Sequence, residues 1–160
     1  MKQKQILLIE DEASVIETIK LMLDEICGEK KYTIDSAFNF FQAMDYLEEK
    51  NYDIIVTDLQ MPGKGLGGNR DYIDGTILNG WAFLYFHILE ENGKYTNQCK
   101  SSKLIIFSEF LDELEKRFKT HPDEQSFKDR IRYVSKGGMH NDEGGTIKLC
   151  TVIEELIKSN

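Results

Sequence analysis

Five polar side chains follow apolar runs of the kind that form buried strands. They are two acids after the first run, an acid after the third, a hydroxyl after the fourth and an amine after the fifth: Glu10, Asp11, Asp58, Ser108 and Lys136. Carboxylates held close together repel, and a hard divalent cation with oxygen ligands and open water positions, such as Mg²⁺, relieves that repulsion. A metal ion beside a lysine is also what a transferring phosphoryl group requires. A carboxylate beside them can act as the nucleophile and form an aspartyl phosphate, and Ser108 can hydrogen-bond a phosphoryl oxygen.

Each of these residues also has an ordinary structural interpretation. An acidic pair after a strand often caps a helix, and an isolated aspartate such as Asp58 usually caps a loop. A lysine in a glycine-flanked turn, such as Lys136, usually faces solvent. The chemical interpretation therefore depends on all five residues standing at the ends of strands in one sheet.

The segment around Asp58 indicates a strand that is buried on both faces. Ile54, Ile55 and Val56 form a β-branched run without polar alternation, as expected when both faces of a strand are covered. The sequence Met61-Pro62-Gly63 then breaks the strand into a loop. Asp58 is therefore expected at the carboxyl end of a central strand, where open α/β sheets bind ligands.

Apolar runs and helical periods alternate along the rest of the chain. The predicted strands are Ile6–Ile9, Tyr32–Ala37, Tyr52–Thr57, Leu104–Phe107 and Ile131–Val134. The predicted helices carry apolar faces within Val15–Ile26, Phe40–Leu47, Trp81–Ile88, Leu111–Phe118 and Ile147–Ile157. This alternation predicts an α/β fold with a doubly wound five-stranded parallel sheet, three α/β/α layers and the flavodoxin-like order 2-1-3-4-5. Parallel strands then end on one edge, which would bring the five polar side chains together.

Several helix ends are predicted from single residues. Ser14, Asn39 and Asn79 are candidate N-caps, because their side-chain oxygens can accept a hydrogen bond from the first turn. Gly28 is a candidate helix stop, because glycine tolerates the left-handed conformation common at helix ends. We interpret the polar segment Glu91–Ser102 as a linker.

The glycine-rich segment at about residues 64–79 is interpreted as a long loop inserted in a single domain spanning residues 1–160. Its start, Gly63–Gly68, contains the pattern GxGxxG, which occurs in dinucleotide-binding sites. Such a site needs a helix that opens at the third glycine, and no apolar stripe follows here. A lid or partner-binding loop is favoured instead, in which Lys64 or Arg70 reaches the phosphoryl site.

Composition excludes several classes of function. The net charge of -8 argues against a nucleic-acid-binding surface and fits a site that gathers carboxylates around a cation. The apolar run near the N-terminus is too short for a signal peptide, and no apolar run is long enough to span a membrane. Cys27, Cys99 and Cys150 lack the spacing of a zinc site or disulfide framework. We expect a cytoplasmic protein with buried thiols.

The chain resembles the receiver domain of response regulators, the phosphoacceptor module of two-component phosphorelays, in its single-domain form. The resemblance rests on the pair Glu10-Asp11, on Asp58 followed by Met61-Pro62-Gly63, on Ser108, and on Lys136 three residues after Tyr133. It implies that Asp58 accepts a phosphoryl group from a phosphohistidine on a sensor histidine kinase or a histidine phosphotransfer protein. Autodephosphorylation would then follow, rather than the turnover of a classical enzyme.

The resemblance also implies a role for each neighbour of Asp58. Mg²⁺ would be bound by Asp11, Asp58 and the main-chain carbonyl of Gln60, with Glu10 acting directly or through water. Lys136 would pair with the phosphoryl group and Ser108 would turn to bond it. Tyr133 occupies the position of the aromatic switch, which turns inward when the hydroxyl is engaged. The signal would leave by contact with a downstream protein target, not through nucleic acid or a membrane.

Two residues depart from the family pattern. Glu109 stands where a small residue is usual, and its charge would act against an incoming phosphoryl group. Gly137 stands where a proline in a cis peptide bond is usual, which would loosen the loop that carries Lys136. Both favour an alternative function, a receiver-like protein-interaction module that is not phosphorylated.

Overall fold

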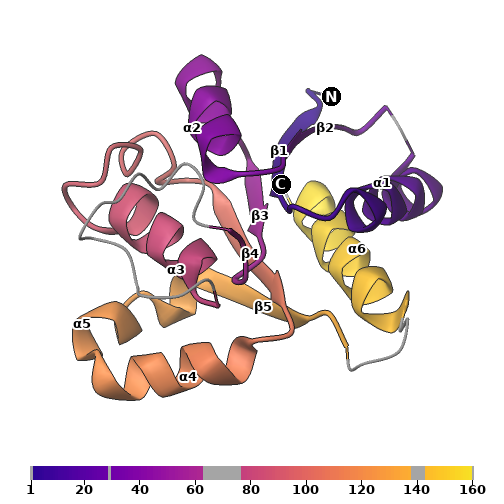
Figure 1. Ribbon diagram of the computed structural model, residues 1–160. Helices are drawn as coiled ribbons and strands as arrows, with labels where there is room; N and C mark the ends of the chain where they lie inside the picture. Colours follow the sequence, from indigo (N-terminus) through magenta and orange to yellow (C-terminus); the bar gives the residue numbers. More distant parts are fainter. Residues whose placement is uncertain (1, 29, 63–76, 138–142, 160) are drawn as a thin grey trace.

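A five-stranded parallel sheet in the order β2-β1-β3-β4-β5 forms the centre of the molecule (Figure 1). The computed structural model describes residues 2–28, 30–62, 77–137 and 143–159. The strands are β1 (Lys4–Ile9), β2 (Tyr32–Ala37), β3 (Ile54–Thr57), β4 (Lys103–Ser108) and β5 (Ile131–Ser135). The predicted fold class and strand order are confirmed.

Helices cover both faces of the sheet and bury a separate hydrophobic core on each (Figure 1). One face carries α1 (Ala13–Cys27) and α6 (Glu143–Lys158), with a core that includes Ile19, Leu23 and Ile153. The other face carries α2 (Phe40–Glu49), α3 (Asn79–Leu84), the π-helical turn η1 (Tyr85–Leu89) and α4 (Leu111–Thr120). Side chains of β3 alternate between the two cores, because successive residues of a strand point to opposite faces. The predicted burial of β3 on both faces is confirmed.

Helix α1 begins earlier than predicted, at Ala13, with Glu12 as its N-cap residue. Ser14 was expected to cap it and lies inside the first turn instead. The Glu12 carbonyl already accepts the N–H groups of Val15 and Ile16, and the Glu12 N–H donates to the Glu10 carboxylate at 3.1 Å. The acidic end of β1 therefore organises the entry to the helix without a side-chain cap.

Two other predicted helix ends are confirmed. The side chain of Asn39 accepts a hydrogen bond from the Gln42 N–H at 3.0 Å and caps α2. Gly28 ends α1 with a φ of 78°, and its N–H donates to the Asp24 carbonyl at 3.0 Å. Both follow from local chemistry, since Asn accepts in the first turn and Gly adopts the left-handed region without strain.

Asn79 is the first residue of α3 and does not cap it, contrary to the prediction. Its side chain is buried, and its amide Nδ2 donates to the Met61 carbonyl at 2.9 Å. The chain on either side of residues 63–76 is therefore joined by this hydrogen bond. The predicted inserted loop and the GxGxxG pattern, with Lys64 and Arg70, lie almost wholly outside the described residues.

The segment between η1 and β4 packs against the core and is not the polar linker that its composition predicted. Tyr95 and Cys99 are buried there, and the Tyr95 N–H donates to the His87 carbonyl at 2.8 Å. Ser102 is buried as well, and its hydroxyl donates to the Tyr52 carbonyl at 2.7 Å. Two apolar side chains among polar neighbours are enough to fix the segment, because both reach the same core.

A partly buried ion pair joins α4 to α5 (Pro122–Gln125), a short helix. Arg117 donates to both oxygens of Glu124, at 2.8 and 2.6 Å. The indole Nε1 of Trp81 in α3 donates to the same carboxylate at 2.8 Å. Glu124 is only 6% exposed. A single turn, η2 (Lys128–Arg130), then leads into β5.

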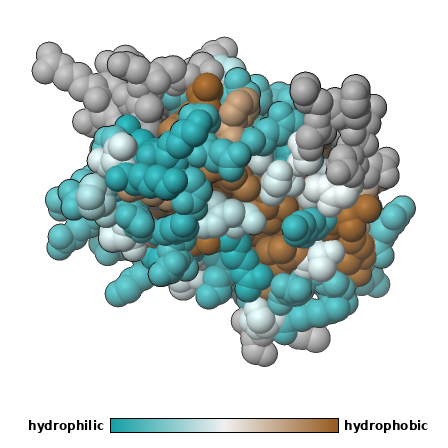
Figure 2. Space-filling view, turned by 90° about the horizontal axis from the view of Figure 1, so that it is seen from below, coloured by the Kyte–Doolittle hydropathy of each residue, from teal (hydrophilic) through white to brown (hydrophobic). Residues whose placement is uncertain are grey.

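The described surface is mostly hydrophilic on the face that Figure 2 shows. Seen from below the view of Figure 1, most surface residues are hydrophilic, and apolar residues appear in smaller areas among them (Figure 2). Among the described residues, no helix has the length and apolar composition needed to cross a bilayer. Cys27, Cys99 and Cys150 are buried free thiols, as expected from their spacing.

Candidate functional site

The register of the sheet places the chemically active residues at one edge. Ile9 of β1 is paired with Thr57 of β3, so Glu10 and Asp58 are the next residues on neighbouring strands. The Asp58 N–H donates to the Ile9 carbonyl at 3.1 Å, which extends the ladder by one residue. On the other side, the Lys136 N–H donates to the Ser108 carbonyl at 3.2 Å. Backbone hydrogen bonds thus fix the starting point of each side chain.

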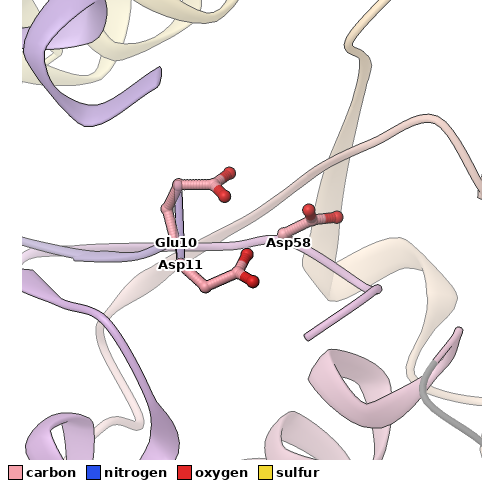
Figure 3. A group of neighbouring side chains, drawn as sticks. All are labelled: Glu10, Asp11 and Asp58. Atoms are coloured by element: carbon pink, nitrogen blue, oxygen red, sulfur yellow. The ribbon is translucent and has the colours of Figure 1, made fainter. Parts of the chain in front are cut away.

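Three carboxylates meet at this edge, as Figure 3 shows. Glu10, Asp11 and Asp58 each offer an oxygen, and these oxygens lie within 4.8 Å of one another. Glu10 is 1% exposed and Asp58 7% exposed, whereas Asp11 is open to solvent. A group of oxygens of this size with one open side fits Mg²⁺, which keeps several waters and takes only a few carboxylate ligands.

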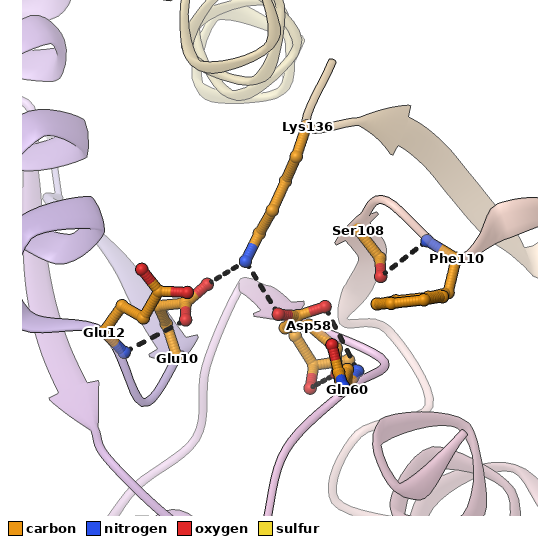
Figure 4. A network of polar contacts seen from close by, with 8 residues as sticks. Glu10, Glu12, Asp58, Gln60, Ser108, Phe110 and Lys136 are labelled. Atoms are coloured by element: carbon orange, nitrogen blue, oxygen red, sulfur yellow. Dashed lines mark hydrogen bonds and ion pairs between the residues drawn. The ribbon is translucent and has the colours of Figure 1, made fainter. Parts of the chain in front are cut away.

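Lys136 lies between the two buried acids (Figure 4). Its Nζ is 2.7 Å from Oε2 of Glu10 and 2.7 Å from Oδ2 of Asp58, although it is 126 and 78 residues away in sequence. The lysine side chain is 13% exposed. Its amine therefore neutralises charge that would otherwise be concentrated on the strand ends.

Burial and charge shift the protonation of this group in opposite directions. Burial raises the pKa of Glu10 to about 7, although the charge and hydrogen bond of Lys136 act to lower it. Burial acts to lower the pKa of Lys136, but the Asp58 and Glu10 carboxylates outweigh it and raise that pKa above its usual value. Lys136 therefore keeps its positive charge at neutral pH, and the raised pKa of Glu10 favours its protonated form more than that of an ordinary glutamate.

The second oxygen of each buried carboxylate accepts a backbone hydrogen bond. Oε1 of Glu10 accepts from the Glu12 N–H at 3.1 Å, and Oδ1 of Asp58 accepts from the Gln60 N–H at 3.2 Å (Figure 4). Both carboxylates are consequently oriented by the turns that follow β1 and β3. Gln60 thus contacts the phosphoacceptor candidate through its N–H, while metal binding by its carbonyl stays a prediction.

Ser108 and Tyr133 lie on the adjacent strands β4 and β5. Ser108 is fully buried, and its Oγ accepts from the Phe110 N–H at 3.2 Å. Tyr133 is half-buried, and its hydroxyl donates to the Lys128 carbonyl at 3.0 Å. Burial raises the pKa of the Tyr133 hydroxyl well above its usual range, so it stays a donor. Their predicted roles as a switch stay predictions.

Both departures from the family pattern can be placed. Glu109 is exposed, directly after Ser108. Gly137 has a φ of 91°, and its N–H donates to Oγ of Ser135 at 3.2 Å. No peptide bond is cis within the described ranges. A positive φ favours glycine, so the residue after Lys136 has a specific conformational requirement.

Sequence reasoning missed one glycine that positions Lys136. A Cβ at Gly145, in the first turns of α6, would stand 2.4 Å from the Lys136 carbonyl oxygen and 2.7 Å from that of Ser135. Only glycine lets α6 approach the end of β5 so closely. A glycine inside an amphipathic helix costs stability and commonly marks a close contact, which is the signal that was available.

Residues 6–69 match the family model of the response regulator receiver domain. This part of the chain is similar to a receiver domain. The family match includes Glu10, Asp11, Asp58 and Gln60, whereas Ser108, Tyr133 and Lys136 lie beyond it. For those three residues, the strand register and the contacts of Lys136 supply the placement.

Solved structures of receiver proteins share the fold over the whole chain. The phosphorylated cyanobacterial phytochrome response regulator RcpA aligns with a TM-score of 0.61 and 17% identity, over 99% of this chain and 96% of that one. The receiver domain of the Francisella response regulator 1452 aligns with a TM-score of 0.58 and 22% identity, over 98% of each chain. The Salmonella typhimurium regulator RcsB, described with DNA interaction, has a TM-score of 0.56 and 18% identity, over all of this chain and 62% of that one. No curated protein sequence matches.

Proposed function

We propose that this receiver domain, taken as residues 1–160, accepts a phosphoryl group on Asp58 from a phosphohistidine of a sensor histidine kinase or histidine phosphotransfer protein. The reaction depends on Mg²⁺. The observation that supports this best is the position of Asp58. One of its carboxylate oxygens is 2.7 Å from the Lys136 amine, and the carboxylates of Glu10, Asp11 and Asp58 have oxygens within 4.8 Å of one another, close enough to bind one ion. A carboxylate that served only as a loop cap would need neither neighbour.

The residues of the chain supply the parts of an in-line transfer. An Asp58 oxygen attacks the phosphorus, the P–N bond to histidine breaks, and its electron pair leaves on the imidazole, which takes up a proton. Lys136 neutralises charge on the phosphoryl oxygens, and the Ser108 hydroxyl donates to one of them. Bound Mg²⁺ would supply further charge neutralisation, held by Asp11, Asp58 and the Gln60 carbonyl, with Glu10 acting directly or through water. Hydrolysis of the acyl phosphate resets the domain.

The signal leaves through contacts with a downstream protein. Engagement of Ser108 by the phosphoryl group draws Tyr133 inward, away from the Lys128 carbonyl that its hydroxyl now contacts. The surface formed by α4, β5 and α6 then favours a different partner. This is a population shift, because the phosphoryl group stabilises only the state in which both side chains have moved.

The direct test is a change in mass. Wild-type protein incubated with Mg²⁺ and acetyl phosphate should gain one phosphoryl group, and the gain should be lost in Asp58→Asn and on adding EDTA. Asp45→Asn is the matched control, because it makes the same change at an exposed position on α2. An adduct that forms equally in both variants would place the acceptor elsewhere.

The alternative is a receiver-like interaction module without phosphorylation. One observation favours it: Lys136 already pairs with two of the three acids and neutralises part of their charge without an added ion. Glu109 beside Ser108 adds negative charge at the site. If no adduct forms with acetyl phosphate, or with a panel of histidine kinases and phosphotransfer proteins, the module replaces the phosphoacceptor as the function.

A further inference from the structure

A cavity lined mainly by lysines lies at the opposite end of the strands from Asp58. Its volume is about 710 Å³, and we call it the lysine cavity after the residues that line it: Lys2, Gln3, Lys4, Lys30, Lys31, Asp53, Ile157 and Lys158. Lys4 begins β1, Asp53 directly precedes β3, and Lys158 ends α6. The cavity is therefore built where the strands begin, while the acidic site is built where they end.

The charge of this cavity is opposite to that of the chain. Five lysines and one aspartate line it, in a protein whose net charge is -8. Two of the lysines form ion pairs: Nζ of Lys4 is 3.8 Å from Oδ1 of Asp53, and Nζ of Lys158 is 2.6 Å from Oε1 of Glu154. Within the described ranges, no ion pair joins Lys2, Lys30 or Lys31 to a carboxylate. Like charges held around one hollow repel, and a bound anion would relieve that repulsion.

The lining residues indicate which anion fits. Lysine ammonium groups bind phosphate oxygens as point charges with several donors, and lysines from three segments need more than one phosphate to engage them. The cavity volume is in the range of pockets that bind small molecules. A binding site for nucleic acid or membrane would be an extended surface instead. Gln3 adds an amide, and Ile157 adds an apolar wall for a ring.

We infer that the lysine cavity binds a small anion with several linked phosphate groups, either a free polyphosphate or the phosphate chain of a nucleotide. The site does not depend on phosphorylation of Asp58, because Asp53 of the lysine cavity and Asp58 lie at opposite ends of β3. Its test can therefore fail or succeed independently of the proposed phosphoacceptor function.

The test is a calorimetric titration of the full chain with inorganic tripolyphosphate, and separately with ATP, in Mg²⁺-free buffer. We expect saturable binding of one ligand per chain that weakens as salt is added. The double variant Lys30→Gln/Lys31→Gln should weaken binding about tenfold or more, because two charge-assisted contacts are lost. Both lysines are exposed, so the change leaves the core intact.

Two controls make the result specific. Lys116→Gln/Lys119→Gln removes the same charge from exposed positions on α4 and should leave the affinity unchanged. Asp58→Asn should also leave it unchanged, which separates this site from the acidic edge. Equal affinity for tripolyphosphate and ATP identifies the phosphate chain as the ligand. Tighter ATP binding that Ile157→Ala selectively weakens identifies a nucleotide. Absence of saturable binding, or equal loss in both lysine double variants, overturns the inference.

Discussion

Gly80 lies directly against the main chain of Asp58. A Cβ at Gly80 would stand 1.8 Å from the Asp58 carbonyl oxygen and 3.0 Å from the Cα of Leu59. The Gly80 N–H also donates to the Leu59 carbonyl at 2.9 Å. The first turn of α3 therefore holds the backbone of the candidate phosphoacceptor. The Asn79–Met61 hydrogen bond joins the same turn to the segment after β3.

This contact predicts that Gly80→Ala disturbs both stability and reactivity. The neighbour is backbone and cannot turn away, so the added methyl group should cost roughly 1–3 kcal/mol of unfolding free energy by overpacking. Asp58 should also be phosphorylated more slowly by acetyl phosphate. Urea denaturation and the mass assay measure the two effects. Gly28→Ala is the control. A Cβ at Gly28 would meet open space, but an alanine would be strained at its φ of 78°, so this variant should lose stability without loss of phosphorylation rate. Normal behaviour of Gly80→Ala would show that α3 moves away at little cost.

Lys136→Met should destabilise the Mg²⁺-free protein strongly. The variant leaves two buried carboxylates without their cation, and breaking a buried ion pair typically costs about 3–5 kcal/mol. The loss should be smaller at pH 5.5 than at pH 8, because Glu10 can take up a proton. Added Mg²⁺ should restore part of it. The exposed pair of Lys116 and Glu113 provides the control, and Lys116→Met should change stability by less than about 1 kcal/mol. Equal losses in the two variants, measured by urea denaturation, would contradict the buried pair.

Glu10 should make stability fall with rising pH in the absence of metal. Burial raises its folded-state pKa to about 7, above the usual 4.5. The folded protein therefore holds a proton that the unfolded chain has released, and the resulting stabilisation is complete below about pH 4.5 and lost as pH rises through about 7. Thermal midpoints between pH 5.5 and 8 should fall more steeply in wild type than in Glu10→Gln. Glu12→Gln alters an exposed carboxyl two residues away and should keep the wild-type slope. The same slope in all three proteins would exclude Glu10 as the titrating group.

Glu124→Gln should weaken the contact between α3, α4 and α5. The change leaves the Arg117 guanidinium without its carboxylate, and hydrogen bonds to charged groups contribute about 1.5–3 kcal/mol each. Burial acts to raise the pKa of Glu124, but Arg117 and Trp81 lower it overall, so its stabilisation is present above pH 4.5 and is lost at more acidic pH. The variant should unfold at a lower urea concentration than wild type. The fluorescence of Trp81 in its folded state should also differ from that of the folded wild type. Glu113→Gln, which removes a carboxylate from the exposed pair with Lys116, should show neither effect.

The sequence by itself determined the alternation of strands and helices and the residues at the strand ends. Ile54–Val56 cannot alternate between core and solvent, and Asp58 directly follows this buried strand. Asn39 and Gly28 end their helices through bonds within a few residues, so they too were predictable. These features depend on local periodicity and local chemistry.

Tertiary structure decided the features that depend on contacts between distant segments. Lys136 bonds residues far from it in the chain, and Gly80 packs on the distant Asp58. The Glu10 pKa near 7 likewise depends on burial by segments that are distant in sequence. Ser14 and Asn79 are both of a residue type that caps helices, but neither does so. The turn after β1 starts α1 before Ser14, and the Asn79 side chain donates to the Met61 carbonyl instead. Desolvation and close approach arise only when the elements pack, because a sequence pattern specifies which residues are buried but not which atoms meet.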